Sequence, residues 1–131
     1  MGRALGVSDS ADVQKCATFN YIATVVTQKF FIAPRKLQVI GIRGCTRVAG
    51  NDGSAVTLSV YKSASGIDVG SGALLHSGTF DVKGTADTNQ ILTLTGNQDS
   101  LILAPGDSLG VVLAGTATAA VGEIQVTMEP I

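Results

Sequence analysis

One segment of the chain has the pattern of an enzyme nucleophile. Gly106-Asp107-Ser108-Leu109-Gly110 has the form Gly-x-Ser-x-Gly, which in α/β-hydrolases turns sharply from a strand into a helix and exposes the serine. The base that activates such a serine is usually a histidine, and this chain contains one, His76. The apolar residues after the motif continue as a strand and not as a helix. We therefore predict that Ser108 is a turn residue, that His76 is an ordinary strand residue, and that the protein is not an enzyme.

Metal and cofactor sites need clusters of ligating side chains, and the sequence offers few. A single histidine forms no histidine cluster for zinc or copper. The aspartates include no Asp-x-Asp pair of the kind that begins a calcium loop, and the glycine-rich residues 70–72 lack the lysine of a phosphate loop. Cys16 and Cys45 are too far apart in sequence for a metal knuckle, so we expect free thiols. The sequence predicts no metal and no cofactor.

The composition is that of a subunit that associates with other proteins. The chain has 131 residues, which is enough for one domain, and 45% of them are hydrophobic. Charged residues make up 15% of the chain, against about 25% in a typical soluble domain. A surface with so few charges leaves apolar side chains for a partner to cover.

Charge is unevenly distributed along the chain, although the net charge is only −1. Residues 1–50 contain seven Lys or Arg and two Asp, whereas residues 51–131 contain two Lys and eight acidic residues. Two arrangements are open: the halves form separate basic and acidic surfaces, or their charges interleave in the folded molecule. A net charge near zero gives no general attraction to nucleic acid or to an anionic membrane, so we predict neither as a partner.

Residues 1–18 differ from the rest of the chain because they are mixed in type and show no apolar period. We predict an N-terminal arm there and one domain over residues 19–131. The first residues lack the apolar core of a signal peptide. The sequence also contains no run of about eighteen apolar residues, the length that a membrane-spanning helix needs. We expect a protein that stays in the cytoplasm in which it is made.

The rest of the sequence predicts short β-strands separated by turns. Residues 55–62 alternate between apolar and polar types, as a half-buried antiparallel strand does. The strongest hairpin signal is Asp52-Gly53, and Pro105-Gly106 predicts a type II turn. Further strands are expected over residues 20–26 and 30–32 (as one bent strand or two), 36–46, 74–82, 91–95, 101–103, 109–113 and 123–129. About eight strands without a helix predict an all-β fold, a single antiparallel β-sandwich of the jelly-roll type. Phe30 and Phe31, beside Lys29, are expected to anchor it rather than to bind nucleic acid.

Two apolar residues in the later strands point away from the predicted core. Alternation puts Ile102 and Val112 on the face opposite to the leucines and the valine that flank them, which are Leu101, Leu103, Leu109, Val111 and Leu113. Either a partner covers this second apolar surface, or the protein's own arm and loops cover it.

The order of these features resembles that of a family of virion proteins. The features are an aromatic strand near basic residues, the turn at residues 49–53 before residues 55–62, the Pro-Gly-Asp corner and a final strand at the end of the chain. They resemble the small β-sandwich proteins of tailed bacteriophages, and most of all their capsid decoration, or cement, proteins. The resemblance covers about residues 20–130.

The resemblance implies a structural virion protein that binds the outside of a capsid and joins neighbouring capsid subunits. Its implied partners are the major capsid protein and further copies of itself, as a homotrimer, and its implied place is the capsid surface after assembly in the host cytoplasm. Basic residues of the arm are expected to meet acidic capsid side chains. The candidate interface residues are Arg3, Lys15, Arg35, Lys36, Ile102 and Val112.

Two other functions stay open. A trimeric receptor-binding or tail-fibre tip domain would present loops such as residues 63–72 to a host surface. A small hydrolase would use Ser108 with His76.

Overall fold

The computed structural model describes residues 15–23, 27–49, 55–115 and 119–131, nearly all of them in β-strands or in the turns between strands. The strands are β1 Lys15–Ala23, β2 Gln28–Ile32, β3 Leu37–Val48, β4 Thr57–Ser63, β5 Ala73–Leu74, β6 His76–Ser77, β7 Phe80–Asp81, β8 Asn89–Leu94, β9 Ile102–Leu103, β10 Ser108–Ala114 and β11 Ala120–Pro130. Two short 3-10 helices, η1 Val69–Ser71 and η2 Gln98–Leu101, interrupt the connections. In the described part of the chain, no helix has the length and apolar character needed to span a bilayer.

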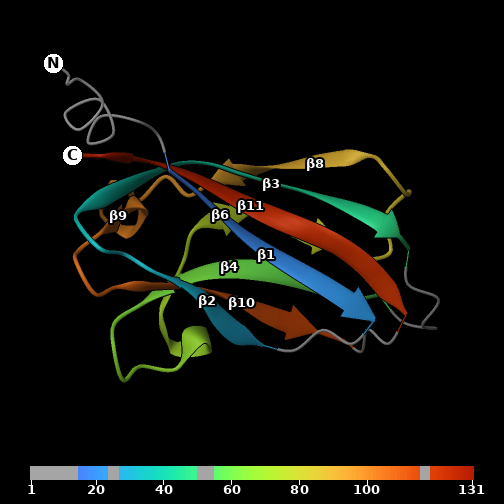
Figure 1. The fold of residues 1–131 in the computed structure, drawn as a ribbon, viewed down its shortest axis with the longest axis horizontal. Helices are drawn as coiled ribbons and strands as arrows, with labels where there is room; N and C mark the ends of the chain where they lie inside the picture. Colours follow the sequence, from blue (N-terminus) through green and yellow to red (C-terminus); the bar gives the residue numbers. More distant parts are fainter. Residues whose placement is uncertain (1–14, 24–26, 50–54, 116–118) are drawn as a thin grey trace, which may run out of the picture.

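The strands form two antiparallel sheets packed face to face (Figure 1). Sheet A has the strand order β1-β11-β3-β8-β6, with β9 paired to β3. Sheet B has the order β2-β10-β4-β5, with β7 paired to β4. The all-β sandwich predicted from the sequence is confirmed.

Successive long strands alternate between the two sheets, which is the jelly-roll arrangement. Strands β1, β3, β8 and β11 lie in sheet A, whereas β2, β4 and β10 lie in sheet B. The outer pairs join the two ends of the chain, β1 with β11 and β2 with β10. The inner pairs are β3 with β8 and β4 with β5. The chain is therefore an antiparallel ribbon rolled up on itself, so that residues far apart in sequence become neighbours.

The structure differs from the predicted strands in three places. Asp52-Gly53 lies outside the described residues, and the strands on either side of it, β3 and β4, belong to different sheets and form no hairpin. The strand predicted over residues 74–82 is three two-residue strands, because the chain passes from sheet B to sheet A and back. Strand β1 begins at Lys15, inside the range predicted as an arm, and residues 1–14 lie outside the described part.

The core lies between the sheets and is made by the inward-facing residues of both. Its largest fully buried side chains include Leu37, Leu58, Phe80, Leu103, Leu109, Ile124 and Met128, each of which stabilises the fold by about 1.5–3 kcal/mol. Phe30 packs against this core, and its ring centroid lies 5.7 Å from that of Phe19, where β1 and β2 meet. The aromatic residues of β2 therefore anchor the strand, as predicted.

The Pro-Gly-Asp corner is the predicted type II turn. The Asp107 N–H donates to the Ala104 carbonyl at 3.0 Å, and Gly106 has φ +91°, which glycine adopts at no steric cost. The corner is also tied to the β2–β3 connection. Ala33 donates its N–H to the Asp107 carbonyl and accepts from the Gly106 N–H, both at 2.8 Å. These bonds hold two of the turns at one end of the sandwich together.

Candidate interaction surfaces

Ser108 and His76 do not form a catalytic pair. Ser108 is the first residue of β10, not a turn residue, and it is 3% exposed opposite Ser63 of β4. His76 is a strand residue, as predicted, and it is 1% exposed. Its Nε2 accepts a hydrogen bond from the Val60 N–H at 2.9 Å, and its Nδ1 lies 3.1 Å from the Gly78 carbonyl oxygen, to which it donates. With Nε2 already bonded, the ring has no nitrogen available to take a proton from a serine.

The surroundings of His76 favour the neutral ring. Burial lowers its pKa, because an imidazolium in this position would lose its hydration. The carbonyls of Ser77 and Gly78 act in the opposite direction, and their effect is smaller than that of burial. His76 is therefore a neutral residue with a structural role.

Cys16 and Cys45 both have free thiols, and both lie in strands of sheet A. On β11, which runs between their strands, Cys16 is opposite Thr127 and Cys45 is opposite Glu123. Two strand spacings and four positions along the strand put their Cα atoms about 16 Å apart, well beyond the separation of about 4.4–6.8 Å in a disulfide. In the described part of the chain, no three His, Cys, Asp or Glu side chains are grouped to hold a metal ion.

Three of the six candidate interface residues come together at one end of the sandwich. Lys15 begins β1, and Arg35 and Lys36 directly precede β3. Both strands pair at this end with the last residues of β11, so the three basic residues flank the end of that strand. Arg3 lies outside the described residues. The sequence alone gave no reason to place Lys15 near Arg35.

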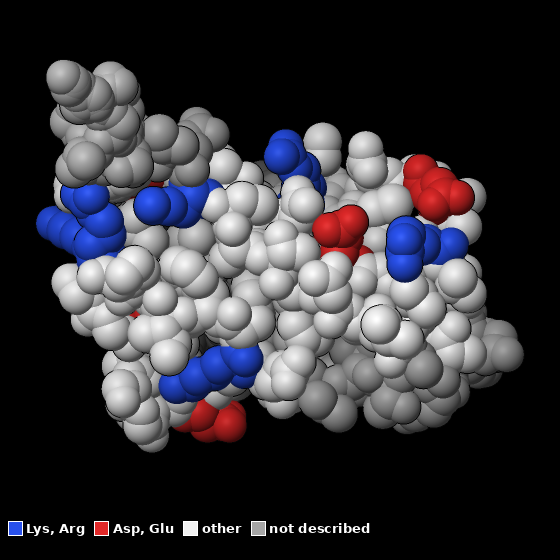
Figure 2. Space-filling model, in the orientation of Figure 1, with Lys and Arg blue, Asp and Glu red and all other residues white. Residues whose placement is uncertain are grey.

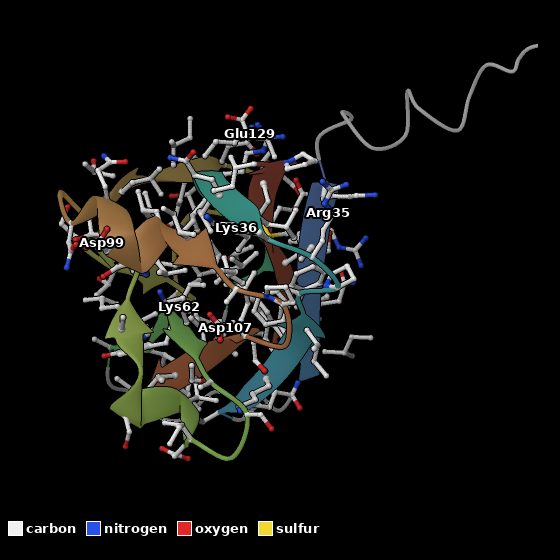
Figure 3. The ribbon with its side chains drawn as sticks, turned by 90° about the vertical axis from the view of Figure 1, so that its left-hand side faces the viewer. Arg35, Lys36, Lys62, Asp99, Asp107 and Glu129 are labelled. Carbon is white, nitrogen blue, oxygen red and sulfur yellow. The ribbon has the colours of Figure 1, made fainter. Side chains whose placement is uncertain are left out.

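Both basic and acidic side chains are present at this end. Figure 3 looks onto this end, where the labelled basic and acidic residues lie among one another: Arg35, Lys36 and Lys62 with Asp99, Asp107 and Glu129. At this end of the sandwich, residues from the basic half of the sequence therefore lie near residues from the acidic half.

Ile102 and Val112 do not share a surface. Ile102 lies in β9, which pairs with β3 of sheet A, whereas Val112 lies in β10 of sheet B. Both are half-buried. The expectation of one second apolar surface fails here because the Pro-Gly-Asp corner carries the chain from one sheet to the other.

A loop of the protein's own chain covers part of the outer face of sheet B. This loop, residues 64–72, includes η1, and its Val69 is 5% exposed. Val69 packs over Gly110 of β10, where a Cβ would lie 2.7 Å from the Val69 Cγ1. The loop is held at its start by Lys29, whose Nζ donates to the Ala64 carbonyl at 3.2 Å. The loop that a receptor-binding domain would present is therefore tied to sheet B at these points.

The outer face of sheet A exposes large apolar side chains on β1 and β8 and is hollowed between these two strands. Ile22 of β1 is 75% exposed, and Ile91 of β8 is 81% exposed. The hollow has a volume of about 370 Å³ and is lined by Arg43, Gly44, Cys45, Asn89, Ile91, Glu123 and Gln125. Figure 2, in which β1 and β11 run across the front, shows few and scattered charged side chains on this side. Sequence reasoning missed this hollow, because its lining comes from three strands whose register has no local signal.

Comparison with known proteins identifies a fold and no family. No protein-family model matches the chain, and no curated protein sequence matches it. A chain of the cyanophage Pam1 capsid asymmetric unit superposes with a TM-score of 0.55 at 12% sequence identity, covering 100% of this chain and 92% of that one. The shared feature is the fold.

Two further solved structures are similar at lower scores. One is a chain of the disulfide-linked pili of Bacillus endospore appendages, with a TM-score of 0.37, 18% identity and coverage of 88% of this chain and 84% of that one. The other is a chain of infectious bursal disease virus, Gx strain, with a TM-score of 0.37, 19% identity and coverage of 89% and 32%. Neither score is high enough to carry an argument about this protein.

Proposed function

We propose that the protein is a structural component of a virus particle, a jelly-roll subunit that binds the outside of a capsid and joins neighbouring capsid subunits. The observation that carries the proposal is the agreement in fold with a chain of the cyanophage Pam1 capsid. The match spans 100% of this chain and 92% of that one, so it extends over nearly the full length of both chains.

The surface supports an assembly role. Charged residues make up only 15% of the chain. In the part of the chain that the structure describes, eight large hydrophobic residues are exposed: Ile22, Ile32, Ile40, Val48, Ile67, Leu74, Ile91 and Ile131. Each can add a small apolar contact with a neighbouring subunit. A capsid presents the same contact many times, so weak contacts that act together hold an added protein firmly.

The positions of Ser108 and His76 speak against the hydrolase alternative. Ser108 is buried at the start of a strand, and both ring nitrogens of His76 are already hydrogen-bonded. A nucleophile must reach its substrate, and a base must have a free lone pair. The receptor-binding alternative gains no specific support, because the loop at residues 64–72 is tied to sheet B.

The finer features of the proposal come from the resemblance to decoration proteins. They are a homotrimer, the major capsid protein as partner, and attachment through the N-terminal arm together with the basic residues of the same end, Lys15, Arg35 and Lys36. Because these residues flank the end of β11, one acidic capsid segment would contact all three.

Co-sedimentation with phage heads that lack the protein tests the proposal. The added protein should bind in a fixed number of copies per head and should raise the temperature at which the heads release DNA. Deletion of residues 2–14 leaves β1 whole and should abolish binding. Lys83→Glu changes a residue that is remote in sequence from Lys15, Arg35 and Lys36, and it should leave binding intact. Binding to host cells instead of heads would favour the receptor-binding alternative, and an absence of binding to heads would contradict the proposal.

A further inference from the structure

The free edge of β1 is long, regular and nearly uncharged. β1 is the outermost strand of sheet A, and it pairs with β11 along all nine residues without a bulge. Its other side makes no backbone hydrogen bond in the described part of the chain. The strand contains no Pro or Gly, and its single charge is Lys15, the first residue. An edge of this kind is a template on which another strand can pair.

The other sheet edges are short or covered. Sheet A ends at β6, which is two residues long. In the neighbouring β8, the side-chain amide of Gln90 pairs with the backbone of Asp81, accepting from its N–H and donating to its carbonyl, both at 2.9 Å. On sheet B, β5 and β7 are two residues each. The other edge of sheet B is β2, which is five residues long and is followed closely by Pro34. Its Lys29 side chain donates a hydrogen bond to the Ala64 carbonyl. Charged or short edges and side-chain covers are the usual protections against unwanted pairing. Among the described residues, none of these protections lies at the edge of β1.

We infer that the free edge of β1 pairs with β1 of a second copy of this chain, antiparallel, so that two copies of sheet A become one continuous sheet. The identity of the two edges decides the direction. When the same edge of two copies pairs across a two-fold axis perpendicular to the sheet, the strands run antiparallel and the two core-facing sides lie on the same face of the joined sheet. In an antiparallel pair centred on Phe19, the two Lys15 side chains, which carry the single charge of each strand, lie at opposite ends of the contact.

The side chains of β1 fit this two-fold contact. On the outer face, Thr18 lies opposite Asn20 of the second copy, so polar residues meet polar ones. Ile22, which is 75% exposed in the single chain, lies opposite Cys16 of the second copy and loses part of its contact with water. Phe19 and Tyr21 keep their places in the core. The contact is therefore made without moving any buried residue.

The inference does not depend on the proposed function. A two-fold contact joins copies in even numbers, so the free protein has a mass that is an even multiple of 13.3 kDa. If the trimer expected for a decoration protein also forms, the product is a hexamer. On a capsid, the same contact would link one bound oligomer to the next.

Native mass spectrometry and sedimentation of the full chain test the contact. The variant Thr18→Lys with Asn20→Lys places Lys opposite Lys at two positions of the antiparallel pair, and it should raise the dissociation constant of the two-fold contact at least tenfold. The matched control is Gln125→Lys with Thr127→Lys. These residues are also on sheet A but in β11, which is paired on both sides, so the mass of this variant should not change. Both variants should keep the circular dichroism of the parent.

A spin label on Cys16, with Cys45→Ser, measures the direction of pairing. The antiparallel pair centred on Phe19 puts the two Cys16 Cα atoms about 20 Å apart, whereas a parallel pair puts them about 5 Å apart. The 20 Å distance should disappear in Thr18→Lys with Asn20→Lys.

Two results would overturn the inference. One is a parent protein that is monomeric or trimeric at high concentration and shows no distance near 20 Å. The other is an odd number of copies in the free protein, together with a loss of capsid binding in Thr18→Lys with Asn20→Lys. That result would mean that the edge of β1 pairs with a capsid chain and not with a second copy.

Discussion

The Nε2 of His76 accepts a hydrogen bond of 2.9 Å from the backbone N–H of Val60, and this bond joins the two sheets of the sandwich. Val60 lies in β4 of sheet B, whereas His76 lies in β6, which pairs with β8 in sheet A. Leu75 completes the link through its backbone. It donates to the Val60 carbonyl at 3.1 Å and accepts from the Thr95 N–H at 2.9 Å. The crossing between the sheets is thus held by one side chain and two backbone bonds.

We expect His76→Leu to lower the free energy of unfolding by about 2–4 kcal/mol. The substitution leaves the Val60 N–H buried without a partner, which costs about 1–3 kcal/mol, and it disturbs the packing around a residue that is 1% exposed. His76→Gln keeps a hydrogen-bond acceptor and should lose less. Urea denaturation measures both, and equal losses would show that packing and not the hydrogen bond sets the stability.

Acid should destabilise the protein in a pH range set by His76. Burial lowers the pKa of His76 in the folded state, whereas the unfolded chain has the ordinary value of about 6.5. Below that pH the unfolded chain binds a proton that the folded chain does not. The free energy of unfolding is therefore at its full value above about pH 6.5 and falls below it, by up to about 1.4 kcal/mol per pH unit.

His76→Gln should flatten the dependence of the free energy of unfolding on pH between about pH 6.5 and 5. The chain has one histidine, and carboxylates dominate this dependence only nearer pH 4. Denaturation midpoints across this range measure the effect. A parent protein whose stability is constant from pH 7 to pH 5 would contradict the assignment.

Two glycines of β3 should respond differently to alanine. At Gly44 a Cβ would lie 2.6 Å from Cε1 of the buried Phe80 and 2.7 Å from the Glu123 carbonyl oxygen, so Gly44→Ala should cost about 1–3 kcal/mol. At Gly41 nothing lies within 4 Å, and Gly41→Ala should leave stability unchanged or raise it by about 0.4–1 kcal/mol. Thermal unfolding of the two variants makes the comparison. Similar losses would mean that β3 does not pack as described.

The packing of the loop at residues 64–72 on sheet B can be tested with a double-mutant cycle. Gly110→Ala should destabilise the protein, because its Cβ would lie 2.7 and 2.8 Å from the two Cγ atoms of Val69. Val69→Ala removes both of those atoms, so the double variant should lose less than the sum of the single losses, by about 0.5–1 kcal/mol or more. Proteolysis within residues 64–72 should rise in Gly110→Ala. Strict additivity would mean that the loop does not lie on Gly110.

Local patterns predicted the strands that keep to one sheet. Val56, Leu58 and Val60 alternate with polar residues in the sequence, and all three are fully buried. Residues 74–82 were not predicted correctly, because this stretch changes sheets twice and no local period records such a change. Asp52-Gly53 misled for a related reason, since it joins strands of different sheets.

The candidate surfaces were predictable only in part. Phe30 and Phe31 were expected to anchor the sandwich, and Phe30 does pack against Phe19. The hollow around Cys45 was missed, because Glu123 and Asn89 reach it from strands on either side of β3. Pairing between distant strands leaves no mark on the residues immediately around each position.

The all-β class and the type II turn at Pro105-Gly106 follow from the amino-acid sequence, because alternation and turn chemistry act over a few neighbouring residues. The three-dimensional fold was needed to know which residues share a surface. It separates Ile102 from Val112, brings Lys15 and Arg35 to the same end of the sandwich, and sets His76 against Val60. The reason is that a rolled antiparallel ribbon pairs strands from opposite ends of the chain, and the energy of that pairing comes from contacts that no local stretch of sequence contains.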